Sequence, residues 1–360
     1  HLRAVPAVPK GVHHVYRQAQ PAAPAAAAIL EPAPVDPRRG QGGPAGCRPK
    51  VRGGPWAWPG ALVGSMGQDP GLGAGPLSQW LHRGLMEAGL DAVLMETRQV
   101  KGALKAMPIK TDRRDAEGIA RLLHLGWFRP VHCKSVSAQE TRAVLGARKA
   151  IQQNMIALEM SLRGLLRNFG LKVGAISRGR FEVRIRELAD GNPMLETATA
   201  PMLRARETLR QELATLEKHV RQFAQDDPVC RRLMTMPGVG AVVALTFHAA
   251  VDDPTRFRSS KRIGPWVGLT PSRNQSGERD VSGGITKAGD VNLRRALCQA
   301  ATVMMNRGRS TWLRTWGAQL AQRRGRKIAM VALARRIAVI LHRIWIDGSV
   351  FQPDAAPKMI

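Results

Sequence analysis

Two stretches of apolar residues at heptad spacing constrain the fold of this chain most strongly. Alternating steps of four and three residues place such side chains along one side of an α-helix, as the seam of a coiled coil requires. A loop-like stretch from about residue 170 to 195 separates the two, which predicts a long antiparallel hairpin or a dimerisation arm with a structural role. The seam residues are Ile151, Met155, Leu158, Leu162, Leu165 and Phe169, then Leu209, Leu213, Leu216, Val220 and Phe223.

The charge of the chain favours a polyanionic partner. There are 55 Lys+Arg against 27 Asp+Glu, a formal net charge of +28 over 360 residues. An excess of this size is typical of nucleic-acid-binding proteins, although a chain that is merely basic, as in some GC-rich bacterial proteomes, is the alternative. Aromatic residues make up 4% of the chain, which argues against a platform that stacks single-stranded bases.

Cysteine usage and hydropathy exclude several other classes. Cys47, Cys133, Cys230 and Cys298 form no Cys-x-x-Cys pair, so the sequence predicts neither a zinc site nor a disulfide framework. No apolar run is long enough to span a bilayer, and the amino end lacks the pattern of a signal peptide. We therefore expect a cytoplasmic protein without a membrane partner.

Composition changes abruptly near residue 71. The first seventy residues are rich in Pro, Gly and Ala at irregular spacing, a composition that predicts neither helix nor strand. From Pro76 the pattern predicts a helix, one short buried strand at residues 92–95, and a second helix that opens near Asp112. Three elements with one strand make an incomplete α/β unit. The first predicted helix would bury one face made of Leu77, Trp80, Leu81 and Leu85.

The carboxy-terminal third carries features suited to phosphate. Gly238 and Gly240 lie in a Pro-Gly-Val-Gly turn before an apolar helix at residues 241–250, where glycines let backbone N–H groups approach a phosphate. A tight helix–helix turn without a ligand is the alternative. Residues 292–346 then predict arginine-rich helices that together form a phosphate-tracking surface. The predicted nucleic-acid-binding side chains are Lys287, Arg294, Arg295, Arg323, Arg324, Arg326 and Lys327.

Two carboxylates and a serine are candidates for chemistry. Asp112 and Asp115 are three residues apart on a predicted helix, so both point the same way, as ligands of a shared divalent cation do. Ser276 lies in a polar loop flanked by glycine; a turn or cap hydroxyl is the alternative role. On a basic chain, this combination suggests phosphodiester chemistry.

These motifs resemble, in order, those of the transposases of the insertion sequence 110/116/902 family. The resemblance covers roughly residues 74–345. It rests on the following segments: Glu96-Thr97-Arg98, Lys110 to Ala116, Pro237 to Gly240, Gly268 to Pro271, Gln275-Ser276-Gly277, and Gly284 to Gly289 with Leu293-Arg294.

The resemblance implies a fold and a mechanism. The expected fold class is α/β plus mainly α: a RuvC-like (RNase H fold) domain with an Asp-Glu-Asp-Asp metal set, a coiled-coil linker, and a serine-bearing helical domain. Asp112 and Asp115 match the last two carboxylates, which would hold Mg²⁺, and Ser276 matches a nucleophile that forms a phosphoserine link to DNA. The resemblance also implies an element-encoded guide RNA and an assembly of several protomers, a dimer or tetramer.

These expectations divide the chain into four parts. Residues 1–70 are a low-complexity segment, expected to be disordered or out of frame, and residues 71–135 a partial RuvC-like domain. Residues 136–227 are the coiled-coil linker, and residues 228–360 are the transposase domain with its helix-hairpin-helix-like motif.

The metal set departs from the family pattern. Gly73 stands where the family has a Glu, and no strand that could carry the first Asp is found upstream. Glu96 is a weak substitute because it belongs to a different family segment. A frameshift or misassigned start in a GC-rich gene would explain the composition of the amino end. Two carboxylates are too few for a well-formed divalent site.

Three functions stay open from the sequence. The first is a Mg²⁺-assisted, serine-dependent DNA recombinase associated with the bacterial nucleoid. The second is a catalytically inactive remnant that still binds nucleic acid. The third, weaker, is a Holliday-junction-type nuclease that hydrolyses DNA without a serine.

Overall fold

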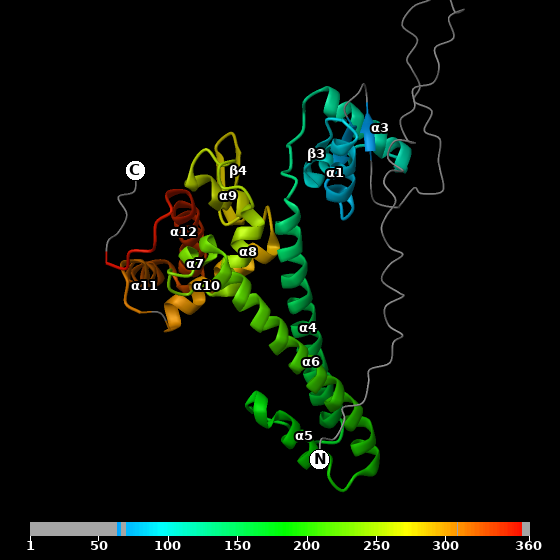
Figure 1. The fold of residues 1–360 in the computed structure, drawn as a ribbon, viewed down its shortest axis with the longest axis vertical. Helices are drawn as coiled ribbons and strands as arrows, with labels where there is room; N and C mark the ends of the chain where they lie inside the picture. The colour runs from blue at the N-terminus through cyan, green and yellow to red at the C-terminus, as the bar shows by residue number, and fades with distance from the viewer. Residues whose placement is uncertain (1–62, 66–69, 308, 355–360) are drawn as a thin grey trace, which may run out of the picture. The chain divides into compact units, whose positions relative to one another are not determined.

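The computed structural model describes residues 63–65, 70–307 and 309–354, which belong to two units (Figure 1). The units are His1–Lys134 and Ser135–Ile360. Almost all of the segment predicted to be disordered, residues 1–62 and 66–69, lies outside the described residues.

The first unit contains a three-stranded sheet, in the order β1 (Val63–Ser65), β2 (Pro70–Gly73) and β3 (Val93–Met95). β2 pairs antiparallel with β1 and parallel with β3, and Gly73 lies opposite Met95. β3 is the predicted strand, but the prediction of a single strand was wrong. β2 was missed because its other residues are proline and glycine, which are not typical of a strand. Its Leu72 is nevertheless buried and packs with Leu94.

Three helices complete this unit: α1 (Ser78–Glu87), α2 (Thr97–Leu104) and α3 (Asp112–His124). α3 packs on β1 and β2. It begins at Asp112 as predicted, because the Thr111 hydroxyl accepts a hydrogen bond from the Arg114 N–H (3.2 Å) and so caps the helix. In α1, Leu85 is buried as predicted, whereas Trp80 is 69% exposed, so its assignment to the buried face was wrong.

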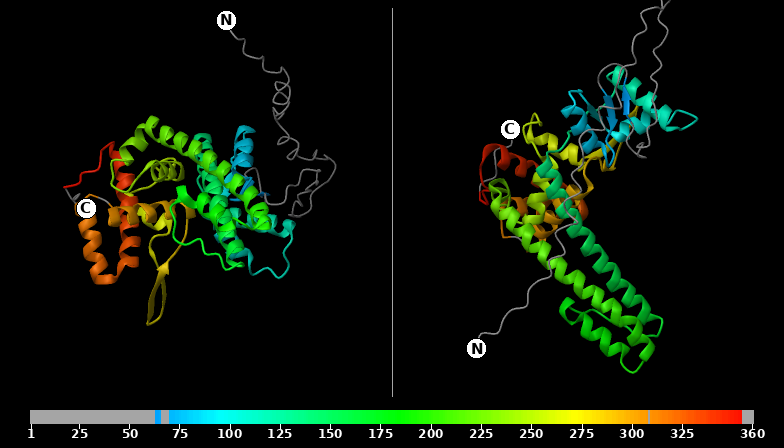
Figure 2. Two further views of the ribbon diagram at one scale, coloured as in Figure 1. Left: turned by 90° about the horizontal axis from the view of Figure 1, so that it is seen from below. Right: turned by 45° about the vertical axis from the view of Figure 1, so that its right-hand side comes forward.

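Two long helices, α4 (Val136–Arg167) and α6 (Pro193–Asp226), lie side by side in the second unit (Figures 1 and 2). The prediction of two long helices is therefore confirmed. Four of the predicted seam residues are buried, namely Met155, Leu162, Leu213 and Val220. Phe169 and Phe223 are 59% and 47% exposed, so the predicted seam was wrong at its ends.

The segment between these helices is not a plain loop. It contains the 3₁₀ turn η2 (Arg178–Arg180) and helix α5 (Phe181–Ala189), whose Phe181, Ile185 and Ala189 are buried. Arg206 of α6 contacts α4, η2 and α5. Its side chain is 4% exposed, and its guanidinium donates to Glu159 of α4 (2.8 Å) and to the Arg178 carbonyl (3.1 Å) and lies over the Phe181 ring.

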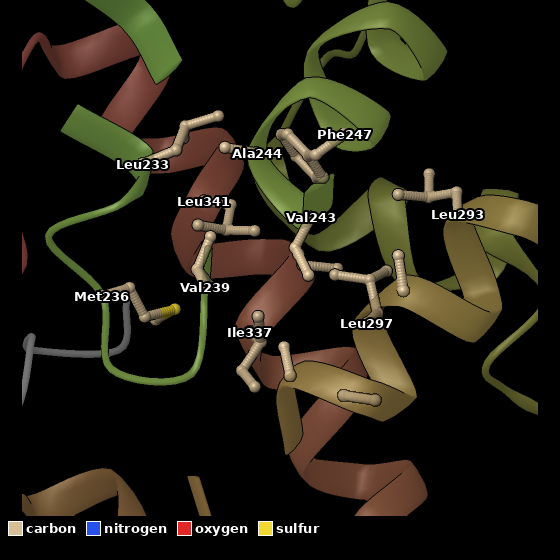
Figure 3. Packing of buried hydrophobic residues seen from close by; sticks show 14 of the residues in the cluster. Leu233, Met236, Val239, Val243, Ala244, Phe247, Leu293, Leu297, Ile337 and Leu341 are labelled. Atoms are coloured by element: carbon tan, nitrogen blue, oxygen red, sulfur yellow. The ribbon is translucent and has the colours of Figure 1, made fainter. Parts of the chain in front are cut away.

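The carboxy-terminal helices share one hydrophobic core with the end of α6. Figure 3 shows the part of this core formed by α7, α8, α10 and α12. α8 is apolar around its circumference and buries Val243, Ala244 and Phe247 against its neighbours, as expected of a central helix. The helices are α7 (Pro228–Leu233), α8 (Ala241–Val251), α9 (Ile263–Val267), α10 (Val291–Arg307), α11 (Trp312–Arg324) and α12 (Arg326–Asp347), with the 3₁₀ turn η3 (Ser260–Arg262) before α9.

The Pro-Gly-Val-Gly turn joins α7 to α8 as predicted. Gly238 has φ +86°, and a Cβ built on it would lie 2.5 Å from the Ala300 carbonyl oxygen of α10. Val239 is buried, while Gly240 is exposed and has open space where a Cβ would be. The turn is therefore packed against α10 on one side and open at Gly240.

A hairpin of β4 (Pro271–Ser276) and β5 (Arg279–Ile285) follows α9. Figure 2 (left) shows it in yellow, extending away from the helices of its unit. Among the described residues, we find no helix whose length and hydropathy would allow it to span a membrane.

Replacing Ile185 tests the packing of α5. Ile185→Ala should destabilise α5 by about 2–5 kcal/mol, because the side chain is fully buried between the long helices and leaves a cavity. Hydrogen exchange of the α5 amides measures this. Val183→Ala is the matched control, since Val183 is 52% exposed and its loss should change little. Equal effects of the two substitutions would contradict this packing.

Replacing the two glycines of the turn tests its contact with α10. Gly238→Ala should cost at least about 2 kcal/mol, since positive φ strains an L-residue and the Cβ would collide with a backbone oxygen. Gly240→Ala should cost no more than about 1 kcal/mol, because its Cβ meets no atom. Urea unfolding followed by circular dichroism compares the free energies of unfolding of the two variants. A larger loss of stability in Gly240→Ala than in Gly238→Ala would contradict the contact of Gly238 with α10.

Candidate functional site

Ser276 is the last residue of β4 and lies directly before the turn of the hairpin. It is opposite Arg279, the first residue of β5, and Gly277 (φ +57°) and Glu278 form the turn between them. The predicted polar loop is therefore a β-hairpin. Ser276 and Arg279 are both exposed, so a hydroxyl and a guanidinium share the same end of a ribbon.

The hairpin is held at its base rather than along its length. All residues of β4 and all of β5 up to Gly284 are exposed, and an ion pair between Arg273 and Asp280 (2.6 and 2.8 Å) bridges the strands. A two-stranded ribbon exposed on both faces is marginal on its own in water. Its position must therefore come from where its two ends join the helical core.

Two glycines allow the two ends to meet backbone to backbone. Gly268 (φ +77°) precedes β4, and Gly289 (φ +74°) follows β5. A Cβ on Gly268 would overlap the backbone of Ala288, and one on Gly289 would overlap the Trp266 carbonyl. The close approach requires glycine at both positions, which explains physically why the sequence has Gly there.

Arg294 of α10 fastens this junction. Its side chain is buried, and Nη1 donates to the carbonyls of Val267 and Ala288, each at 2.8 Å. One guanidinium nitrogen thus ties the segment before the hairpin to the segment after it. This placement gives Arg294 a structural role and corrects its assignment to the phosphate-binding surface.

Asp290 connects the same junction to α4. Its carboxylate accepts hydrogen bonds from the N–H groups of Asn292 (2.7 Å) and Leu293 (3.0 Å) and from Arg142 Nη1 (2.6 Å). Burial raises the pKa of Asp290, but Arg142 and the two N–H groups favour the charged form and lower the pKa below its usual value. Asp290 therefore stays ionised while it caps α10.

The remaining basic candidates form two groups at the two ends of α10. Lys287 and Arg295 are exposed beside the hairpin base. The other group surrounds Gly325, where α11 meets α12, and reaches the far end of α10 through Arg326, which donates to the Asn306 side chain. Its exposed side chains are Arg323, Arg324, Arg326 and Lys327. α10 has 17 residues and separates the groups by roughly 25 Å.

Asp112 and Asp115 lie in the first turn of α3, in the other unit. Asp112 is exposed, whereas Asp115 is buried and its Oδ2 lies 3.9 Å from Lys110 Nζ. Within the described part of the chain, no third His, Cys, Asp or Glu ligand joins them in a cluster that could hold an ion. These two residues alone do not fit a complete Mg²⁺ site.

Gly73 and Glu96 lie at the same edge of the first unit's sheet, where the parallel strands β2 and β3 end. Gly73 ends β2, and a Cβ there would be in ordinary contact with Thr97 at 4.0 Å, so the position has room for a side chain. Glu96 is the N-cap residue of α2, and its carboxylate lies 3.9 Å from Arg129. Glu96 is therefore already opposed by a cation.

Sequence reasoning missed Arg279, Arg142 and Asp290. The Ser-Gly-Glu-Arg segment has the spacing of a two-residue hairpin turn, which would have placed Arg279 opposite Ser276. No local signal predicts that Arg142 meets Asp290, since 148 positions separate them.

The chain resembles known transposases. Residues 230–316 match the family described as Transposase IS116/IS110/IS902 family. The chain is 28% identical over 277 residues to the transposase for insertion sequence element IS1111A of Coxiella burnetii, covering 74% of each chain. It is 29% identical to a probable family 20 transposase of Pseudomonas aeruginosa, covering 75% of this chain and 82% of the relative.

A third relative extends the comparison. The transposase for insertion sequence element IS1328 of Yersinia enterocolitica is 25% identical over 280 residues, with 76% of this chain and 82% of the relative covered. The matched segment contains Ser276, the hairpin base and the Pro-Gly-Val-Gly turn. Residues 230–316 therefore carry a domain of the IS116/IS110/IS902 transposase family, and most of the chain is similar to insertion-sequence transposases.

Proposed function

We propose that this protein is an insertion-sequence transposase that cleaves and rejoins DNA strands with Ser276 as the nucleophile. The observation that carries the proposal is the position of Ser276, which is exposed at the end of a projecting hairpin inside the segment that matches the family. A nucleophile at such a position can reach a phosphodiester in a duplex without burying the DNA.

The chemistry balances without an external energy source. Ser276 Oγ bonds to phosphorus, the bond from phosphorus to a deoxyribose oxygen breaks, and the hydroxyl proton ends on that leaving oxygen. The phosphoserine link conserves the phosphodiester, so a deoxyribose hydroxyl from another strand can attack it and release the serine. Arg279, opposite Ser276 across the hairpin, is suited to bind the non-bridging oxygens of the phosphate.

The basic side chains support a DNA substrate. Lys287 and Arg295 lie at the hairpin end of α10, and Arg326, one of the four cations around Gly325, contacts its other end. A span of roughly 25 Å corresponds to about seven base pairs of B-DNA, so one duplex can contact both groups. A DNA substrate would place the protein at the bacterial nucleoid.

The remaining parts of the proposal rest on the family resemblance. Asp112 and Asp115 are the proposed Mg²⁺ ligands, and a complete site would need further ligands. An element-encoded guide RNA and a dimer or tetramer are proposed on the same ground. The net charge of +28 is compatible with two nucleic-acid partners.

Ser276→Ala tests the nucleophile. The purified full chain is incubated with Mg²⁺ and a supercoiled plasmid that carries the insertion sequence encoding it, together with RNA transcribed from that element. Wild type should form a protein–DNA adduct that survives detergent, and Ser276→Ala should lower adduct formation at least about 1,000-fold, as removal of a nucleophile does.

Ser282→Ala is the matched control, because Ser282 is an exposed serine of the same hairpin. It should keep the adduct. An adduct that persists in Ser276→Ala would contradict the proposal. Salt-sensitive plasmid binding by wild type without any cleavage would instead identify a nucleic-acid-binding remnant.

A further inference from the structure

Three potential metal ligands converge where α6, α7 and α8 meet. Asp227, Cys230 and His248 each direct a ligand atom to one place, and these atoms lie within 4.8 Å of one another. Asp227 directly follows α6, Cys230 is in α7 and His248 is in α8. The sequence spacing gave no sign of this group, because its cysteine has no Cys-x-x-Cys partner.

The surrounding structure orients two of the three ligands. Asp227 Oδ1 accepts hydrogen bonds from the N–H groups of Val229 (2.7 Å) and Cys230 (3.0 Å), and Oδ2 lies 3.3 Å from His248 Nδ1. The His248 ring packs on Trp345, with ring centroids 4.6 Å apart. Partners that fix a carboxylate and an imidazole in this way are typical of the surroundings of metal ligands.

We propose that Asp227, Cys230 and His248 bind a Zn²⁺ ion. A thiolate, an imidazole and a carboxylate form a mixed donor set of the kind that Zn²⁺ prefers. Zn–ligand bonds of about 2.0–2.3 Å place tetrahedral ligand atoms roughly 3.3–3.8 Å apart, and the Asp227–His248 pair is at 3.3 Å. One thiolate and one carboxylate also balance the two charges of the ion.

Access and protonation are compatible with this ion. Cys230 is fully buried, while the side chains of Asp227 and His248 are 23% and 30% exposed, which leaves a solvent side for a fourth ligand such as water. Burial beside Asp227 raises the pKa of the Cys230 thiol. A bound cation would stabilise the thiolate form of Cys230.

The ion would have a structural role. It would fix the end of the long helix α6 to α7 and α8, which flank the Pro-Gly-Val-Gly turn. Metal binding at this site is measured without DNA, so its outcome is separate from that of the proposed function. The alternative explanation is an Asp227–His248 ion pair beside a buried thiol, with no ion.

Cobalt binding tests the site. The full chain, freed of metal and kept reduced, is titrated with Co²⁺, which replaces Zn²⁺ and reports its ligands by absorption. We expect one equivalent to produce visible bands of tetrahedral Co²⁺ and a thiolate-to-cobalt charge-transfer band in the near ultraviolet. Zn²⁺ should remove both by competition and should raise the Tm of the apoprotein.

Variants assign the bands. Cys230→Ser should abolish the charge-transfer band, and Asp227→Asn should lower Co²⁺ affinity at least tenfold while Asn still caps α7. Cys298→Ala, which removes a partly buried cysteine outside the proposed site, should leave the spectrum unchanged. A wild-type chain without the charge-transfer band, or a band that survives in Cys230→Ser, would overturn the proposal.

Discussion

The geometry of the candidate site depends on one buried guanidinium. Arg294 donates to a carbonyl on each side of the hairpin, Val267 before it and Ala288 after it. Hydrogen bonds from a charged donor are among the stronger ones in a protein interior, and a buried Arg without them would be costly. The two strands beyond this junction bury almost no surface of their own, so the junction decides where Ser276 lies.

The residues around Arg294 allow the two ends of the hairpin to meet and hold α10 in place. Gly268 and Gly289 bring two backbone segments closer than any side chain would allow, and Asp290 fixes the start of α10 through its cap and its ion pair with Arg142. α10 is in turn packed on α8 and α12 in the hydrophobic core. The core therefore fixes α10, α10 carries Arg294, and Arg294 fixes the hairpin. The catalytic proposal for Ser276 requires this chain of contacts.

Periodicity predicted the parts of the fold that bury a regular apolar face. The heptad residues predicted α4 and α6, the apolar run predicted α8, and the helix expected to open near Asp112 is α3. The hairpin was missed because β4 and β5 have no buried face, so their sequences do not alternate. Strand β2 was missed because a single buried Leu72 lies among Pro and Gly. Helix α5 had a signal, since Phe181, Ile185 and Ala189 are spaced at i, i+4 and i+8, but the arginines between them obscured it.

The candidate site was predictable only in part. Ser276 and the basic segment around Gly325 could be named from the sequence, because exposed functional groups show in composition and motif. Arg294 could not be distinguished from its neighbour Arg295, since the two differ in which face of α10 they occupy and therefore in burial. Long-range pairs such as Arg142 with Asp290 follow from the folded topology alone.

Hydrogen exchange at the hairpin base tests the central role of Arg294 most directly. In the structure, the Thr286 N–H donates to Thr270 and the Lys287 N–H donates to Gly268. Arg294→Met should speed exchange of both amides at least tenfold over wild type while the α8 amides stay protected, and Arg295→Met should leave all of them unchanged. Unchanged protection at Thr286 and Lys287 in Arg294→Met would contradict the account.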